Sequence, residues 1–378
     1  MKVALSFPGC HRKAGVERIV FECAHFLASR SHDVTVLANE WEAEPSLPIK
    51  YHYVPVRPRP GYLRGASYFR SATRELGHES FDVLNTHGCV CPYGGVQWVQ
   101  SVHRAWLDRS RAFRPLHSAA RWKQNLNPLH PVLLGLEEKH FRQRRYRKVI
   151  ATTQDVKNDL MHYYQVPADD VVIVPNGFAP AEFNPERREQ RREEMRERLG
   201  LKRGDVALLF VANELERKGY RTILDAMRRL RRANLRLLVV GRPDVVHVKR
   251  LAAEAGLGPQ VVACGPTQDV SAFHAAADVF VLPTQYEAFC LAILEALGSG
   301  LPVVTSRVPG AHDAIEPGVN GFLVDDPKDG AGLASALEPL LDTDFRNALS
   351  AKVPDTVIKY QWPFVLERYE QVLLQNRT

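Results

Sequence analysis

Residues 277–305 have the sequence ADVFVLPTQYEAFCLAILEALGSGLPVVT, which alternates between two kinds of apolar run. The β-branched runs at 279–282 and 302–305 favour strands, whereas residues 292–297 are typical of a buried helix. Two strands of one sheet that are joined by a helix run parallel to each other. This segment therefore predicts a β-α-β unit of an α/β domain.

The same alternation continues through the chain in two series. The second series begins after Asn176-Gly177 and a predicted helix of alternating charge at 186–203. Two series of this kind predict two doubly wound parallel-sheet domains, whose ligands bind beyond the carboxyl ends of the strands and, if the domains face each other, in a shared cleft. The predicted strands are 2–7, 32–37, 81–86, 98–102, 149–152, 206–211, 235–240, 261–264, 279–282 and 302–305, and the predicted helices include 16–28, 220–232, 248–255, 292–297 and 362–375.

The composition of the 378-residue chain, with 45% hydrophobic residues, is that of a globular protein. Such a length exceeds what one hydrophobic core usually organises, which agrees with two domains. No apolar run approaches the roughly 20 residues that a membrane span requires, and the N-terminus lacks a signal-peptide pattern, so we expect a cytoplasmic protein. The six cysteines lack the spacing of zinc sites, so we expect reduced thiols and no bound metal.

Two glutamates give the clearest chemical signal. Glu295 lies in the predicted apolar helix 292–297, where a carboxylate is costly unless it has a partner. A ribose can donate two hydrogen bonds to it, and a local arginine is the structural alternative. Glu287 precedes the helix, where the helix dipole alone also favours an acid. We expect the N–H groups that begin this helix to face phosphate or sugar oxygens; they belong to Phe289, Cys290 and Leu291.

A pair of cations follows the predicted strand 206–211. Arg217 and Lys218 precede Gly219, which permits a close approach of the backbone. Two cations at the carboxyl end of a strand suit a departing diphosphate. An Arg-Lys pair in a loop often only faces water, so its position after the strand is what favours a functional interpretation.

Two further candidates lie in the first series. His103 follows the predicted strand 98–102, and His87 competes with it after the strand 81–86. Gly15 ends the loop after the first predicted strand and precedes a helix, although one glycine also fits an ordinary turn.

These residues resemble family 4 of the retaining GT-B glycosyltransferases, which includes bacterial lipopolysaccharide-core glycosyltransferases and phosphatidylinositol mannosyltransferases. The resemblance spans nearly the whole chain. It rests on Glu287 and Glu295 in their context, on Arg217-Lys218-Gly219, on Val174-Pro-Asn-Gly177 with Phe183, and on Gly318-Val-Asn-Gly-Phe-Leu-Val324.

The resemblance implies a GT-B fold of two Rossmann-like domains. An acceptor domain would comprise 1–176 together with the C-terminal helix 362–378, and a donor domain would comprise 177–361. It also implies transfer of a hexose from a UDP- or GDP-sugar to a saccharide or lipid-linked acceptor, in lipopolysaccharide or other cell-envelope polysaccharide synthesis, without a metal or cofactor.

The residue roles follow from the same resemblance. Arg217 and Lys218 would bind the donor diphosphate and Glu295 the ribose. Glu287 would contact the transferred sugar, His103 would lie beside it, and Gly15 would approach the donor. Two positions depart from the family pattern: Cys290 replaces a usual glycine, which leaves the identity of the sugar open, and Ala14-Gly15 replaces a usual double glycine.

The charge distribution leaves alternatives open. Residues 103–150 contain twelve Lys or Arg against three acids, while the whole chain has a formal charge of +7. The basic segment 103–148 also contains aromatic residues. It could contact the anionic inner face of the cytoplasmic membrane, or it could form a solvated surface whose apolar residues pack inward. Two other functions remain: a GT-B nucleotide-sugar 2-epimerase, and a non-enzymatic polyanion-binding protein. The acidic pair argues against a nucleic-acid partner.

Overall fold

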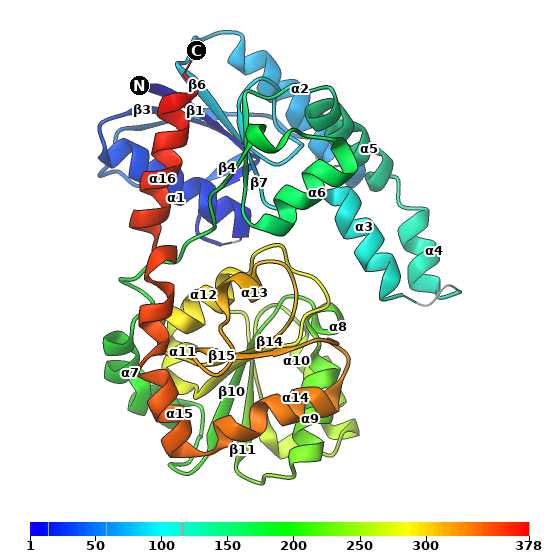
Figure 1. Cartoon of the computed structure of the whole chain (residues 1–378), viewed down its shortest axis with the longest axis vertical. Coiled ribbons are helices and arrows are strands. Elements are labelled where there is room, and N and C mark those ends of the chain that lie inside the picture. The colour runs from blue at the N-terminus through cyan, green and yellow to red at the C-terminus, as the bar shows by residue number, and fades with distance from the viewer. Residues whose placement is uncertain (14, 58, 115–116, 378) are drawn as a thin grey trace. The chain divides into compact units, whose positions relative to one another are not determined.

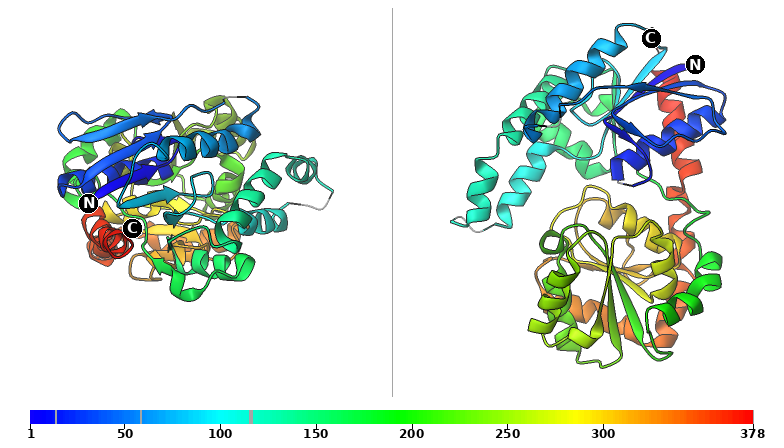
Figure 2. Two further views of the ribbon diagram at one scale, coloured as in Figure 1. Left: turned by 90° about the horizontal axis from the view of Figure 1, so that it is seen from above. Right: turned by 180° about the vertical axis from the view of Figure 1, so that it is seen from behind.

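The computed structural model describes residues 1–13, 15–57, 59–114 and 117–377. The chain divides into two compact units: unit 1 comprises Met1–Asn176 and Pro363–Thr378, and unit 2 comprises Gly177–Trp362. In each unit, helices surround a central parallel sheet, as Figures 1 and 2 show. The predicted α/β class is therefore confirmed.

The sheet of unit 1 has seven strands in the order β5-β3-β1-β6-β7-β8-β9, and its neighbouring strands are parallel. Two of these strands were not predicted, because β5 at the sheet edge is largely polar and β9 has only three residues. The predicted strand 98–102 is wrong in its bounds. The strands are β1 (Lys2–Ser6), β3 (Asp33–Ala38), β5 (Ile49–Tyr53), β6 (Val83–His87), β7 (Val96–Val99), β8 (Lys148–Ala151) and β9 (Val171–Ile173), and a separate pair is β2 (Gly9–Cys10) with β4 (Glu40–Trp41).

The helices of unit 1 include a group that projects from it. The helices α3, α4 and α5 lie in the connection between β7 and β8, and α4 lies at the far end of this group (Figures 1 and 2). The helices of this unit are α1 (Gly15–Ser29), α2 (Arg64–Leu76), α3 (His103–Ala112), α4 (Ala119–Asn125), α5 (Leu129–Glu137), the short π-helix η2 (Glu138–Arg142) and α6 (Gln154–Tyr164).

The sheet of unit 2 has six parallel strands in the order β12-β11-β10-β13-β14-β15. Its central strands are almost entirely buried, which explains why their apolar runs predicted them closely. They are β10 (Val206–Val211), β11 (Leu235–Val240), β12 (Val261–Gly265), β13 (Val279–Leu282), β14 (Val303–Ser306) and β15 (Gly321–Val324), of which β15 was not predicted.

Two helices of unit 2 differ from the predicted bounds for identifiable reasons. The predicted helix 186–203 ends earlier because Gly200 adopts a φ of 67°, a left-handed conformation that terminates helices. The predicted helix 248–255 begins earlier because the side chain of Asp244 caps it by accepting a hydrogen bond from the Val246 N–H. The helices are α7 (Pro185–Arg198), α8 (Leu215–Lys218), α9 (Tyr220–Leu230), α10 (Val245–Glu254), α11 (Ser271–Ala276), α12 (Leu291–Gly298), α13 (Ala311–Ala314), α14 (Gly330–Leu337) and α15 (Thr343–Ser350).

The last helix, α16 (Trp362–Gln375), packs on unit 1 from Pro363 onward. The hydroxyl of Tyr369 donates to Asn85 Oδ1 at 2.9 Å, and Glu370 Oε1 lies 2.6 Å from His32 Nε2. Both residues of α16 are buried. Polar contacts with two separate parts of unit 1 therefore fix the position of this helix on it.

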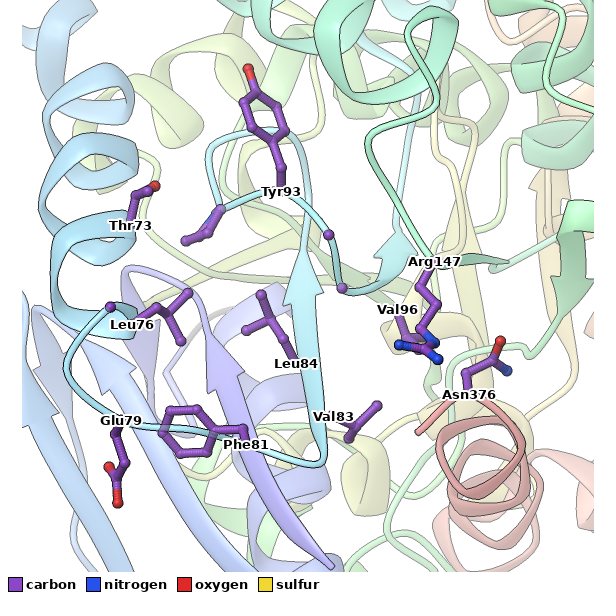
Figure 3. A pocket seen from close by; sticks show the side chains of 14 residues that line it. Thr73, Leu76, Glu79, Phe81, Val83, Leu84, Tyr93, Val96, Arg147 and Asn376 are labelled. Carbon is purple, nitrogen blue, oxygen red and sulfur yellow. The ribbon is translucent and has the colours of Figure 1, made fainter. Parts of the chain in front are cut away.

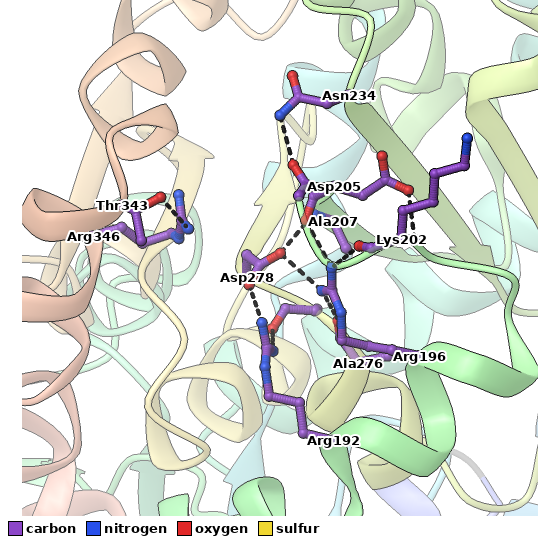
Figure 4. Close-up of polar contacts among 12 residues, drawn as sticks. Arg192, Arg196, Lys202, Asp205, Ala207, Asn234, Ala276, Asp278, Thr343 and Arg346 are labelled. Carbon is purple, nitrogen blue, oxygen red and sulfur yellow. Dashed lines mark hydrogen bonds and ion pairs between the residues drawn. The ribbon is translucent and has the colours of Figure 1, made fainter.

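A buried ion network joins α7 to the sheet of unit 2 (Figure 4). Asp278 is 4% exposed, and its carboxylate contacts the guanidinium groups of Arg192 and Arg196. It also accepts a hydrogen bond from the Ala207 N–H at 2.8 Å. Burial alone would raise the pKa of Asp278, but the two arginines and this hydrogen bond lower it below its usual value.

We expect Asp278→Asn to lower the free energy of unfolding by about 3 kcal/mol, because it leaves two guanidinium groups without their buried anion. Urea unfolding of the variant measures this. The control is Glu338→Gln, which breaks an exposed pair with Arg232 and should cost about 0.5 kcal/mol or less. Equal costs for the two variants would show that the Asp278 network does not stabilise unit 2.

Candidate functional site

The order of the strands brings two predicted motifs of unit 2 together. The chain passes from β10 to β11 and β12 on one side, and β13 lies on the other side of β10. The order of the sheet thus reverses between β10 and β13, and the loops after these two strands lie at the same edge. In doubly wound sheets, such a switch point is where ligands bind.

An ion cluster occupies this switch point. Arg217 Nη1 lies 3.0 Å from Glu287 Oε1, and the ammonium group of Lys218 contacts the same oxygen. Burial alone would raise the pKa of Glu287, but Lys218 and Arg217 lower it below its usual value. Glu287 is therefore ionised at neutral pH and balances part of the charge of both cations. This pairing was not predicted, because the two cations and the acid belong to separate motifs that lie far apart in the sequence.

The backbones of the two loops also contact each other. Arg217 Nη1 donates to the Tyr286 carbonyl at 2.7 Å, and the Gln285 N–H donates to the Arg217 carbonyl at 2.9 Å. Gly219 follows with a φ of 84°, and a Cβ atom there would lie 2.1 Å from the Pro283 carbonyl oxygen. Only glycine permits this approach, so Gly219 determines how closely the two loops pack.

The helix α12 begins beside this cluster. Cys290 is its N-cap residue and Leu291 its first residue, while Phe289 is buried just before them. Burial raises the pKa of the Cys290 thiol to about 11, so this thiol is neutral at physiological pH. The N–H groups of a first helical turn have no partner within their helix. Glu295 lies on α12 and is 7% exposed.

His103 is the first residue of α3 in unit 1, and β7 before it ends at Val99, earlier than predicted. Its side chain is half-buried, and its Nε2 atom lies 3.0 Å from His130 Nδ1. Burial lowers the pKa of His103 to about 4, and His130 contributes to the shift. The imidazole is therefore neutral at physiological pH. It can exchange hydrogen bonds with a sugar but adds no charge.

The competing His87 lies in the core of unit 1. It is 0% exposed, its Nε2 atom lies 2.8 Å from Asn85 Oδ1, and burial lowers its pKa to about 3. These contacts are those of a structural histidine.

Gly15 begins α1, and its exposed backbone has open space where a Cβ atom would lie. Nothing in the described part of the chain therefore requires glycine at this position. Its neighbour Ala14 lies outside the described residues.

A pocket in unit 1 lies away from these residues (Figure 3). It is lined by Val83, Val96 and Arg147, which begin or precede β6, β7 and β8. It is thus at the amino ends of the strands, whereas Gly15 and His103 follow the carboxyl ends of β1 and β7. No predicted site residue is among the described residues that line it.

The described residues contain neither a candidate metal site nor a candidate membrane span. No group of three or more His, Cys, Asp or Glu side chains is placed to hold a metal ion. Within the same residues, no helix combines the length and apolar character that crossing a membrane requires.

Comparison with known proteins identifies the family. The family model for group 1 glycosyl transferases matches residues 191–354, and the model for family 4 glycosyltransferases matches residues 14–182. The lipopolysaccharide glucosyltransferase WaaG of Escherichia coli K12 is 27% identical over 327 residues, which cover 83% of this chain and 82% of that protein.

Solved structures show the same fold. A crystal structure of WaaG, a glycosyltransferase involved in lipopolysaccharide biosynthesis, matches with a TM-score of 0.83 and 24% identity over 98% of this chain and 99% of that one. Anabaena Alr3699/HepE in complex with UDP and glucose matches with a TM-score of 0.72 and 19% identity over 99% of both chains. The two parallel sheets form a GT-B fold, and the chain belongs to the family 4 glycosyltransferases, enzymes that use nucleotide sugars.

Proposed function

We propose that this enzyme transfers a hexose, with retention of configuration, from a UDP- or GDP-sugar to a saccharide or lipid-linked acceptor. The observation that carries the proposal is the cluster of Arg217, Lys218 and Glu287 at the switch point of unit 2. The names of the relatives support it, since WaaG is a lipopolysaccharide glucosyltransferase and HepE was solved with UDP and glucose. By this analogy, the pathway is the assembly of lipopolysaccharide or another cell-envelope polysaccharide.

Unit 2 binds the donor in this proposal. Arg217 and Lys218 bind the diphosphate, and their shared contact with Glu287 keeps both side chains directed at one place. The first N–H groups of α12, around Phe289, Cys290 and Leu291, add hydrogen bonds to the phosphate or sugar. Glu295 binds the ribose hydroxyls, and Glu287 contacts the transferred sugar. We expect no metal requirement, because the two cations and the first N–H groups of α12 together offset the charge of the phosphates.

Unit 1 binds the acceptor and contributes His103 and Gly15. His103 contacts the reacting sugar as a neutral hydrogen-bonding group, in agreement with its lowered pKa. Gly15 offers an exposed backbone to the donor, since no described residue, apart from its chain neighbours and the backbone of its own helix, lies within 4 Å of the place where a Cβ atom would be.

The reaction follows from these placements. The acceptor oxygen forms a bond to the anomeric carbon on the face from which the nucleotide leaves, while the bond from that carbon to the β-phosphate oxygen breaks. The electron pair of the broken bond stays on the diphosphate, which takes up the proton of the acceptor hydroxyl. Arg217 and Lys218 stabilise the developing negative charge, and this electrostatic effect supplies most of the catalysis.

We also propose that the basic segment 103–148 contacts an anionic membrane on its cytoplasmic side. Trp122 and Leu126 are 62% and 73% exposed, and Lys123 between them is exposed too. They belong to or follow α4, which lies at the far end of the projecting helices (Figure 1). Apolar side chains beside cations suit the interface of an anionic bilayer, where a lipid-linked acceptor would be found.

Nucleotide binding tests the donor site. We expect UDP or GDP to bind tightly and without Mg²⁺, and Glu295→Ala to weaken binding by about tenfold or more because a buried charged hydrogen bond is lost. Isothermal titration of UDP, GDP, ADP and TDP, with and without Mg²⁺, measures this. If none binds, the proposed donor site is wrong; conversion of the donor sugar without any acceptor would instead indicate the epimerase.

Pyrophosphate binding tests the ion cluster separately from the base and sugar. Lys218→Ala should weaken pyrophosphate binding by about tenfold or more, and Glu287→Gln should strengthen it because an anion beside the cations is removed. Glu216→Gln on the same short helix is the control, since its exposed pair with Arg221 should matter little. Unchanged affinity in both test variants would show that the cluster does not bind the diphosphate.

Vesicle binding tests the membrane contact. We expect the protein to sediment at low salt with vesicles of phosphatidylcholine and phosphatidylglycerol but not of phosphatidylcholine alone, and the Trp122→Ser, Leu126→Ser double variant to lose several-fold in binding. Val246→Ser is the matched control, because Val246 is 73% exposed but lies in unit 2. Failure of the wild type to sediment with anionic vesicles would refute the membrane contact.

A further inference from the structure

The first turn of α3 receives its cap from a distant carboxylate. The N-cap position is Val102, whose side chain makes no capping hydrogen bond. Instead, Glu137 of α5 accepts hydrogen bonds from the N–H of His103 at 2.5 Å and from the N–H of Arg104 at 3.2 Å. An anion at this place satisfies two N–H groups and interacts favourably with the helix dipole.

Glu137 makes these contacts in the interior of unit 1. It is 2% exposed, and the hydroxyl of Tyr164 on α6 donates to it at 2.6 Å. Burial raises the pKa of Glu137 to about 7, and its three donors act in the opposite direction. A buried carboxylate is costly, so three donors that converge on it indicate a specific task at the start of α3.

The other end of α3 has its own anchor. Arg109 forms two hydrogen bonds of 2.8 Å with the carboxylate of Asp159 on α6. Such a bidentate pair fixes orientation as well as distance. With Glu137 at its start and Asp159 near its end, α3 has little freedom to shift along or about its axis.

A second residue of α5 contacts the His103 ring. His130 lies two helical turns before Glu137, on the same buried face of α5, and is 8% exposed. Its Nδ1 atom lies 3.0 Å from His103 Nε2, while Trp106 stacks on the His103 ring with centroids 5.4 Å apart. Among the described residues, Nδ1 of His103 has no hydrogen-bond partner, so this nitrogen is available to a substrate.

We propose that Glu137 and His130 are positioning residues for His103: Glu137 fixes its backbone, and His130 fixes the plane and the protonated nitrogen of its ring. One face of α5 thereby presents His103 Nδ1 to the sugar. This inference rests on the proposed function, in which His103 contacts the reacting sugar. It adds two residues that touch no substrate and act only through His103.

A double-mutant cycle tests whether the two residues act through His103. The measured rate is the release of UDP from UDP-glucose by the full-length enzyme. His130→Leu should lower kcat about tenfold with KM changed less than about threefold, because a displaced group impairs the reaction more than donor binding. His130→Asn, which can restore a polar partner for Nε2, should recover most of the rate.

The background variant His103→Gln gives the decisive comparison. In this background, adding His130→Leu should have no further effect on kcat, since the residue acts through a ring that is absent. Glu137→Gln keeps one acceptor oxygen, so it should lower kcat less than His130→Leu does in the wild type. It should likewise have no further effect on kcat in the His103→Gln background. The control is His274→Leu, because His274 is buried in unit 2, where its Nδ1 atom lies 3.0 Å from the Val270 carbonyl oxygen and its ring lies against Phe183 and Phe280. Full-size effects that persist in the His103→Gln background would overturn the inference.

Nitrogen NMR of ¹⁵N-histidine-labelled protein separates this inference from the proposed function, since it needs no turnover. The His103 signals are those missing from His103→Gln. In the wild type at pH 7 they should show one tautomer, and in His130→Leu they should move toward the average of two. Identical His103 signals in these two proteins would overturn the role of His130, whatever the enzyme transfers. Tautomer fixation without release of UDP would instead count against UDP-glucose as the donor, and not against the role of His130.

Discussion

The site in unit 2 depends on one contact, the shared ion pair of Glu287 with Arg217 and Lys218. It can form only because β10 and β13 are neighbours in the sheet, so that the loops after them meet at one edge. The chain that connects these strands passes through β11 and β12, and the glycine at 219 lets the two loops pack closely. Topology, backbone conformation and charge thus converge on the same few residues.

The candidate group in unit 1, the imidazole of His103, differs from the cluster in unit 2 because it is neutral. His103 follows a strand that is shorter than its apolar sequence suggests, and a new helix begins at the residue itself. The start of that helix relies on Glu137, which lies far along the chain. The backbone and the ring of His103 therefore both contact α5, and not only residues next to His103 in the sequence.

The sequence predicted the fold class and most strands because buried parallel strands are continuous apolar runs. The strand β5 was not predicted, because it lies at the sheet edge, is largely exposed and contains Lys50 and His52. The helix before Gly200 was predicted too long, because a pattern of alternating charge does not reveal a left-handed turn. Among the candidate residues, Arg217, Lys218 and Glu287 come together in the structure. Their pairing, and the contacts of Glu137 and His130 with His103, could not be predicted, since both join residues that are distant in sequence.

In the proposed function, the two units therefore divide the chemistry by charge. Unit 2 supplies two cations whose partner anion leaves a net positive charge, which suits a diphosphate that becomes more negative as it departs. In the proposed function, unit 1 supplies an imidazole whose pKa of about 4 keeps it neutral, so it adds no positive charge that would attract the phosphates. A protonated histidine would attract the diphosphate as well. In the proposed function, the burial that lowers the pKa of His103 thus suits it to the uncharged sugar, while Arg217 and Lys218 supply the positive charge for the diphosphate.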